Sequence, residues 1–327
     1  MLHRVKLGVL IQFLSRMSQS VKISGWANRP VIDASVFRPG TIGELQSIVK
    51  RNEKILARGN GRSYGDASLF PTAVSTLKLN KLLNFDEKTG ILTCQSGILL
   101  SEILDWALPH GWFFMVAPGT KFITVGGAIA ADVHGKNHPV DGSFSRWLTQ
   151  FKLLTSDGNL ITCSRTDHPD LFWKTIGGMG FTGVITEATF QLRKVSTPKM
   201  SQETQKTDSL DEVFDLFESE NPASYQIAWV DCLDKKARSV FYSGEHIDGD
   251  FNFQSIQSSK EKNRQLSHVE AGNGFKVSLL NSLSINIFNQ FYWLKQRTGN
   301  SIVPFEQFFF PLDSAGAWNR FYGPEGF

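Results

Sequence analysis

Cysteine is scarce in this sequence, and its charges nearly balance. Only three cysteines occur among 327 residues, Cys94, Cys163 and Cys232, and none belongs to a C-x-x-C pair. This spacing provides neither a disulfide framework nor a zinc site, so a reducing compartment such as the cytoplasm is the simpler interpretation. The formal net charge of +3 is too weak to indicate nucleic-acid binding.

The motifs of the two commonest phosphate-binding loops are missing as well. A P-loop ends in Gly-Lys-Ser/Thr, which occurs nowhere in the chain. Residues 55–69 read ILARGNGRSYGDASL, where Gly59 and Gly61 match the fingerprint G-x-G-x-x-G but Tyr64 stands at the third glycine. This loop therefore predicts either a tight turn or a phosphate cradle outside the Rossmann fold.

Long apolar runs are also lacking at the N-terminus. The first 20 residues have a basic start and a short apolar stretch, interrupted by Gln12, that is too short to span a bilayer. We expect residues 1–24 to be a leader, either disordered or an interfacial helix, and Met17 is an alternative start. The remaining length has room for two domains with ample cores.

Apolar spacing and turn residues predict the main elements of the first domain. Thr41 and Glu44 form a T-x-x-E capping box before a helix, and residues 54–58 form a strand that leads into the glycine loop. A helix is predicted over 99–111, a hairpin over 151–164 and a strand over 183–192. Composition then becomes polar, which places a domain boundary between residues 195 and 196.

The second half is predicted to mix helices and strands. Helical spacing occurs over 209–219 and 277–297, and strand patterns occur over 225–234 and 306–313. The helix over 277–297 has aromatic residues beside Lys295 and Arg297, which is typical either of a membrane-surface contact or of a helix that faces the core.

A second glycine cluster lies at residues 118–139. Gly126 and Gly127 open a run of small residues, so backbone N–H groups can approach a ligand closely. If the run is helical, its N-terminus also favours phosphate. Two glycine-rich segments, neither of which forms a Rossmann turn, favour a large phosphate-containing ligand. They indicate FAD bound in a fold other than the Rossmann fold.

These blocks together resemble a known family. RGNGRSYGD, PGT, TVGGAIAADVHGKNH, GSF, LFWKTIGGMGFTG, AWVD and QFFFPLDSAGAWNRFYGPEGF are similar to FAD-dependent oxidases of the vanillyl-alcohol-oxidase-like class, in the decaprenylphosphoryl-β-D-ribose 2'-oxidase branch. The resemblance implies an α+β fold. A PCMH-type FAD-binding domain of two subdomains would occupy residues 25–195, and a partial α+β substrate (cap) domain would occupy 196–327.

The resemblance also implies the cofactor site. The position of the histidine that carries covalent flavin in many relatives corresponds to Arg62, and no histidine lies between His3 and His110. We therefore expect non-covalent FAD. The implied cofactor-binding residues are Arg58, Gly59, Asn60, Gly61, Arg62, Ser63, Tyr64, Gly65, Asp66, Gly119, Thr124, Val125, Gly126, Gly127, His134 and Ile185.

The implied reacting groups are His134 and Lys136. His134 and His138 are four residues apart, but Gly135 and Pro139 oppose a continuous helix and no third ligand is evident, so we expect no metal. Lys136 is either a charge for a substrate phosphate or a solvated lysine.

Substrate contacts are implied for Trp229 and Gln307. Their alternatives are core packing for the tryptophan and a strand hydrogen bond for the glutamine.

The expected reaction is oxidation of the 2'-hydroxyl of a polyprenylphosphoryl-ribose. The family's catalytic lysine lies in a segment beyond the equivalent of Phe327, so we expect a truncated chain of weak or no activity. Smaller departures are Ala131 in place of a cysteine and Pro139 in place of a histidine.

Two other functions remain open. One is a sugar-lactone or alditol oxidase of the D-arabinono-1,4-lactone oxidase type, and the other is a degenerate FAD-binding protein without turnover. The implied partners are a lipid-linked sugar phosphate and a short-chain reductase that completes an epimerisation. We expect a cytoplasmic location, peripheral at the inner face of the membrane.

Overall fold

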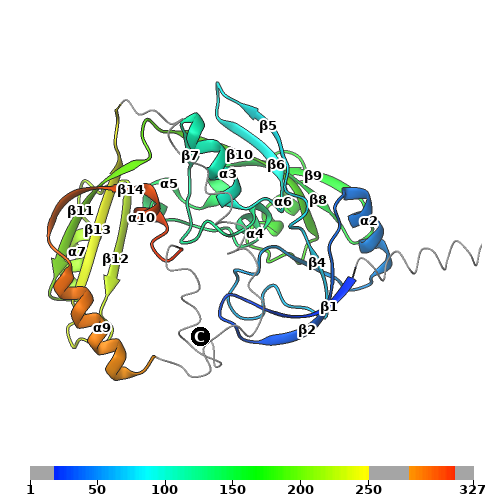
Figure 1. Ribbon diagram of the computed structural model, residues 1–327. Helices are drawn as coiled ribbons and strands as arrows, with labels where there is room; N and C mark the ends of the chain where they lie inside the picture. The colour runs from blue at the N-terminus through cyan, green and yellow to red at the C-terminus, as the bar shows by residue number, and fades with distance from the viewer. Residues whose placement is uncertain (1–17, 250–279, 314–327) are drawn as a thin grey trace, which may run out of the picture.

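A computed structural model describes residues 18–249 and 280–313 of the chain. Three β-sheets with helices on their faces form an α+β molecule (Figure 1), so the fold class expected from the sequence is confirmed. Of the N-terminal leader expected at residues 1–24, the part from Ser18 onward is a strand instead, and residues 1–17 lie outside the described residues.

The first sheet delivers the glycine loop that follows Arg58. Its order is β1-β2-β4-β3, with β1 antiparallel to β2 and the other neighbours parallel. Thr41 caps α2 by accepting a hydrogen bond from the amide of Glu44, and the Glu44 carboxylate accepts one from the amide of Gly40. The elements are β1 (Ser18–Ser24), β2 (Val31–Phe37), α2 (Ile42–Arg51), β3 (Leu56–Arg58) and β4 (Thr72–Ser75).

The second sheet forms the centre of the molecule (Figure 1). Its order is β5-β6-β10-β8-β9, and β7 pairs with the far end of β10. Its strands are β5 (Leu82–Asp86), β6 (Ile91–Gln95), β7 (Trp112–Phe114), β8 (Leu148–Leu154), β9 (Leu160–Ser164) and β10 (Val184–Lys194). Its helices are α3 (Leu100–Ala107), η1 (Leu108–His110), α4 (Val125–Ala130), α5 (His138–Asp141), η2 (Phe144–Trp147) and α6 (Pro169–Thr175).

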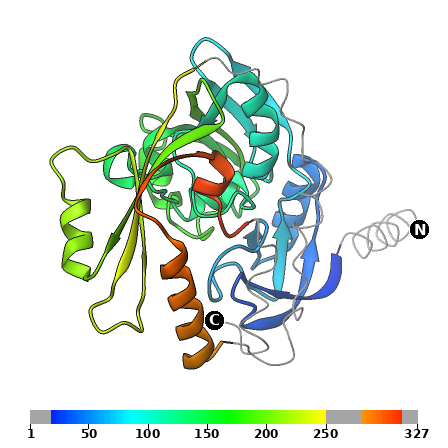
Figure 2. The same ribbon diagram turned by 60° about the vertical axis from the view of Figure 1, so that its left-hand side comes forward.

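The third sheet stands at one side of the molecule, with a helix outside it and two helices on its inner face (Figures 1 and 2). Its order is β12-β13-β11-β14, antiparallel throughout. Its elements are β11 (Lys199–Thr207), α7 (Leu210–Phe217), β12 (Tyr225–Val230), β13 (Ser239–His246), α9 (Ser282–Lys295), β14 (Gly299–Pro304) and α10 (Phe305–Phe309).

The apolar core continues from the second sheet into the third. Phe113 on β7 lies 4.8 Å from Phe309 and 5.6 Å from Phe305 between ring centroids, and Tyr225 on β12 lies 4.9 Å from Phe309. The short helix α10 therefore fills the space between the two sheets. The domain boundary expected at residues 195 and 196 falls between β10 and β11 and stays a prediction.

Most elements of the first half follow the sequence expectations. The apolar face of α3 is buried, Gly111 ends the following turn with a φ of 76°, and β8 and β9 form the hairpin around Asp157 and Gly158. Within the described residues, no helix is long and apolar enough to cross a bilayer.

The strand expected over residues 306–313 is wrong. Residues 305–309 form α10 instead, because Phe305, Phe308 and Phe309 follow helical i, i+3, i+4 spacing and all three are buried on one side. Residues 314–327 of the family-like C-terminal block lie outside the described residues.

Candidate functional site

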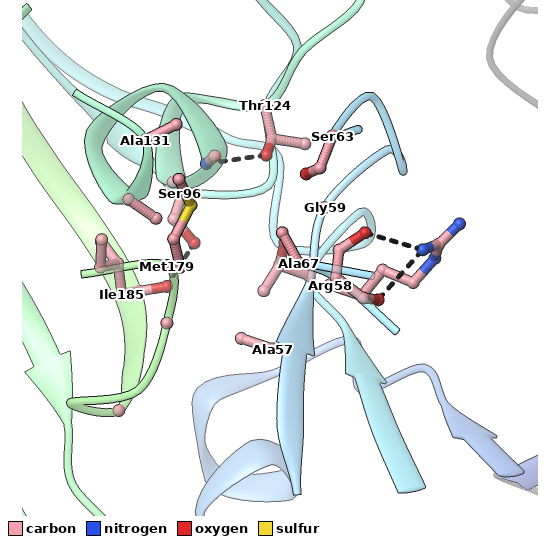
Figure 3. Close-up of a pocket in the computed structure, with 17 residues that line it drawn as sticks. Ala57, Arg58, Gly59, Ser63, Ala67, Ser96, Thr124, Ala131, Met179 and Ile185 are labelled. Atoms are coloured by element: carbon pink, nitrogen blue, oxygen red, sulfur yellow. Dashed lines mark hydrogen bonds between the residues drawn. The ribbon is translucent and has the colours of Figure 1, made fainter. Parts of the chain in front are cut away.

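A cavity lies between the first and second sheets, where two loops come within contact distance. A Cβ placed on Gly59 would lie 2.3 Å from Oγ1 of Thr124, so only glycine fits between the loops. Figure 3 shows Ser63 and Thr124 at one end of the cavity and Met179 and Ile185 at the other. The lining residues are Ala57, Arg58, Gly59, Ser63, Ala67, Ser68, Thr76, Ser96, Thr124, Gly126, Gly127, Ala130, Ala131, Met179, Gly180, Gly183 and Ile185.

The first glycine loop offers backbone donors that the protein itself does not use. The amides of Gly59, Asn60, Gly61, Ser63 and Gly65 donate no hydrogen bond within the described part of the chain. Gly61 is buried and has a φ of +63°. Unused, partly buried amides on a loop with left-handed residues are typical of an anion-binding nest.

Arg58 supports this loop from behind. Its guanidinium donates to the carbonyl of Ser24 at 2.7 Å and to the carbonyl and hydroxyl of Ser68 at 3.1 and 3.0 Å, and it extends away from the cavity (Figure 3). Burial lowers its pKa to about 10. A Cβ on Gly61 would strike this guanidinium at 2.2 Å, so the arginine and the glycine fix the loop together.

The rest of the first loop lies farther from the cavity. The side-chain amide of Asn60 donates to the carbonyl of Phe122 at 2.7 Å and so joins the two loops. Arg62 lies over the ring of Trp26 at 4.4 Å, and its pKa is lowered to about 10, first by burial. The remaining residues expected there, Tyr64, Gly65 and Asp66, are exposed and do not line the cavity.

The second glycine cluster gives the cavity its shape but offers a ligand few hydrogen-bond donors. Thr124 caps α4 by accepting from the amide of Gly127 at 3.1 Å, and the amide of Gly126 donates to the carbonyl of Ser96 at 2.8 Å. The amide of Val125, which is fully buried, donates to Ile98. These amides are therefore not free for a ligand, contrary to the expectation from the sequence, and the glycines serve close packing against the cavity.

Gly119 lies outside the cavity. It is exposed, and a Cβ there would meet nothing within 4 Å.

A third glycine-rich loop also lines the cavity, and its glycines are not among the residues expected there from the sequence. Met179, Gly180 and Gly183 line the cavity opposite the first loop, and the amides of Gly180 and Gly183 donate no hydrogen bond within the described residues. Ile185, which was expected at the site, follows this loop on β10. The signal was the sequence GGMGFTG, whose glycines at 177, 180 and 183 have positive φ.

The lining chemistry fits FAD. Among the described residues that line the cavity, only Arg58 has an ionisable side chain, and its guanidinium points away from the space; none of them is a carboxylate, a histidine or a cysteine. The empty space, with its open mouth, is about 580 Å³. Small side chains, unused amides and the absence of lining carboxylates suit a pyrophosphate with flat rings at either end.

His134 and Lys136 lie near the third sheet and outside the lining of this cavity. The ring of His134 is exposed, 5.2 Å from the ring of His138 and inclined to it by 74°. The ammonium group of Lys136 donates to the carbonyl of Phe308 and lies 4.9 Å from the ring of that residue. Burial lowers the pKa of Lys136 to about 8, so the solvated alternative for this lysine is wrong.

The described residues contain no group of three histidine, cysteine, aspartate or glutamate side chains able to hold a metal.

The two expected substrate residues lie on the third sheet and on α10. Trp229 on β12 is half-buried, and its ring is 4.6 Å from that of Tyr292 on α9. Gln307 is exposed on α10, so its expected alternative as a strand residue is wrong.

Comparison with known proteins adds sequence relationships to this geometry. The FAD binding domain family matches residues 34–164. The chain is 32% identical over 321 residues to decaprenylphosphoryl-beta-D-ribose oxidase of Mycolicibacterium smegmatis, over 94% of this chain and 70% of the relative. It is 25% identical over 181 residues to L-gulonolactone oxidase of Mus musculus, over 53% of this chain and 40% of the relative. It is 28% identical over 178 residues to L-galactono-1,4-lactone dehydrogenase 2 of Oryza sativa subsp. japonica, over 52% of this chain and 30% of the relative.

Proposed function

Because this chain belongs to the FAD-dependent oxidase family that includes decaprenylphosphoryl-beta-D-ribose oxidase, we propose that it oxidises the 2'-hydroxyl of a polyprenylphosphoryl-ribose. Membership in this family confirms the expected PCMH-type FAD-binding domain and FAD as the cofactor. The observation that carries the proposal is the first glycine loop, in which Gly59 and Ser63 line the cavity and their amides donate no hydrogen bond within the described residues.

In this proposal, each part of the site has a separate role. The first glycine loop holds the pyrophosphate, and the loop of Gly180 and Gly183 lies beside the adenine, near Ile185. FAD, when bound, supplies the hydride acceptor. His134 lies beside the reacting ring, and Lys136 orients the phosphate of the substrate. The lowered pKa of Lys136 also lets this amine exchange a proton near neutral pH.

A lipid-linked substrate is supported by an exposed apolar stripe on α9. Leu283, Ile287, Phe291 and Leu294 recur every three or four residues and are 63–74% exposed. Lys295 beside them is also exposed. We propose that this stripe contacts the membrane surface where the lipid resides. A short-chain reductase that reduces the keto sugar completes the proposed reaction sequence.

A second candidate is a lactone or alditol oxidase, and the similarity to L-gulonolactone oxidase favours it. The two candidates differ in the solubility of the substrate. The third candidate is a degenerate protein that binds FAD without turnover, so that neither substrate reduces the bound flavin.

A substrate panel tests the proposal. The purified chain is loaded with FAD and mixed anaerobically with a polyprenylphosphoryl-ribose, L-gulono-1,4-lactone and D-arabinitol, and the loss of flavin absorbance is followed. We expect bleaching by the lipid-linked sugar. Bleaching by the lactone or the alditol alone would contradict the proposed substrate, and no bleaching by any of them would support the degenerate FAD-binding protein.

The mode of flavin attachment is tested separately. Since none of the described residues that line the cavity is a histidine or a cysteine, we expect acid precipitation to release all the flavin into the supernatant. Colour that remained with the precipitated protein would contradict non-covalent binding.

A further inference from the structure

A buried polar network lies beneath the loop that carries His134. The side-chain amide nitrogen of Asn137, which is completely buried, donates to the carbonyl of Met115 at 2.7 Å and to the carboxylate of Asp141 at 2.6 Å. Asp141 also pairs with Arg193 on β10 at 2.6 Å. Because this nitrogen meets two acceptors, the orientation of the Asn137 amide is determined.

The same loop is held from the other side by the third sheet. The carbonyl of Lys136 accepts a hydrogen bond from the amide of Gln226 on β12 at 2.8 Å, and its ammonium group donates to Phe308 on α10. The loop from His134 to His138 therefore lies between an ion pair on the second sheet and two contacts with the third. The histidines at the two ends of this loop, His134 and His138, are exposed to solvent, whereas Asn137 is buried.

The composition of the network argues against a role in stability alone. Burying two charges costs free energy that their attraction seldom exceeds. Moreover, Oδ1 of Asn137 and Nε of Arg193 are buried and have no hydrogen-bond partner within the described residues. A buried ion pair is therefore weak evidence for stability, and its better attested use is to fix one arrangement of the chain.

We propose that Asp141 and Arg193 are positioning residues, which act through Asn137 to hold the loop of His134 against β12 and so place His134 beside the flavin. The place of His134 relative to the flavin rests on the proposed function, whereas the anchoring of the loop does not. A small displacement of a positioned group can cost a large factor in rate or affinity, since its geometry must match the ligand closely.

The chain offers a matched control in a second buried network of the same composition. Asp231 pairs with Arg238 at 2.9 Å and accepts from the side-chain amide of Asn289 at 2.6 Å. It joins the end of β12 to α9 and has no contact with the loop of His134. Asp141→Asn and Asp231→Asn each remove one buried charge and keep the size of the side chain.

Two measurements compare these variants with the wild-type chain. The first is the FAD dissociation constant, from quenching of flavin fluorescence. The second is the position of the His134 ring signals in NMR spectra of the chain labelled with nitrogen-15 histidine, recorded without FAD. We expect Asp141→Asn to weaken FAD binding about tenfold and to shift the His134 signals, since a hydrogen bond to a charged group is lost. We expect Asp231→Asn to lower the melting temperature but to leave both readouts unchanged.

The outcomes separate this proposal from the proposed function. If Asp141→Asn lowers only the melting temperature, as Asp231→Asn does, the network is structural and the proposal is wrong. If the wild-type chain binds no FAD, the proposed function fails, but a shift of the His134 signals confined to Asp141→Asn still supports the anchoring of the loop. If the wild-type chain binds no FAD and the His134 signals of Asp141→Asn equal those of the wild-type chain, the anchoring of the loop is wrong as well.

Discussion

At the scale of single residues, the cofactor cavity depends on the absence of side chains. Because Gly59 has no Cβ, its loop can lie against Thr124 of the second loop. Gly61 in the same way lies against the guanidinium of Arg58. In the proposed function, amides and small side chains around them take the place of the charged groups that bind phosphate in many other sites. Adding a single methyl group is therefore a sharper test here than removing a charge.

Gly59→Ala tests this dependence. Its Cβ would lie 2.3 Å from Oγ1 of Thr124, so the loops must move apart and the amide of residue 59 is displaced. We expect FAD affinity to fall at least about tenfold, since each lost charge-assisted hydrogen bond contributes about 1.5–3 kcal/mol. Titration of the chain with FAD, followed by fluorescence, measures the effect.

The control for this variant is Gly43→Ala, because a Cβ on that helical glycine meets nothing within 4 Å. Its FAD affinity should equal that of the wild-type chain. An equal affinity in Gly59→Ala would show that the two loops tolerate separation.

At the scale of elements, two helices in the second half of the chain differ from the simplest interpretation of their sequences. Helix α10 has only five residues, but its phenylalanines connect the second and third sheets. In α9 only Asn289 is buried, and Leu283, Phe291 and Leu294 are exposed. One face of α9 packs on the third sheet through Tyr292 and Asn289, and the other face is exposed, so the membrane contact expected from the sequence stays a prediction.

The exposed stripe of α9 leads to a prediction about membranes. We expect the double variant Phe291→Ser, Leu294→Ser to lose most of its co-sedimentation with vesicles of phosphatidylserine and phosphatidylcholine, because the two side chains are 68% and 74% exposed. Tyr292 is left unchanged, since its hydroxyl lies 2.7 Å from that of Tyr242 and is part of the fold.

Phe214→Ser on α7 is the matched control for the membrane experiment, because this residue is also exposed, at 53%, but has acidic neighbours. Equal binding by the double variant and the wild-type chain would exclude the stripe as a membrane contact.

At the scale of the whole molecule, a shared core joins the second and third sheets. His246 at the end of β13 lies in this core, 3.1 Å from the hydroxyl of Tyr225 and 5.5 Å from the ring of Phe113 between centroids. Burial, and then the charge of Arg193, lower its pKa to about 4. The histidine is therefore neutral in the folded protein at neutral pH.

Acid should weaken this junction. The folded pKa of His246 lies below the ordinary value of 6.5, so the unfolded chain binds more protons between pH 6.5 and 4, and stability falls as the pH falls through that range. At pH 5 we expect a loss of about 1–2 kcal/mol relative to pH 7. Urea unfolding of the wild-type chain and of His246→Gln at both pH values measures it, and the variant should lack this part of the loss. An equal loss in both would place the acid sensitivity elsewhere.

The sequence by itself determined the local features of this protein. Glycine spacing, capping residues and apolar periodicity gave α2, α3, the β8–β9 hairpin and β10, because neighbours along the chain control these elements. The glycine-rich motifs that resemble the family indicated the FAD-binding domain. Several of their glycines, such as Gly61 and Gly180, have a positive φ that other residues rarely adopt, so they mark fixed turns in the sequence.

Only the tertiary structure decided how the amides are used and where the second half of the chain packs. The amide of Gly126 donates to Ser96, which is distant in sequence, whereas the amide of Gly180 has no acceptor within the described residues. Residues 306–309 are helical because the aromatic side chains of this segment fill a space between two sheets, which no local pattern specifies. Such features depend on which distant segments meet, and that is determined by the packing of the whole chain.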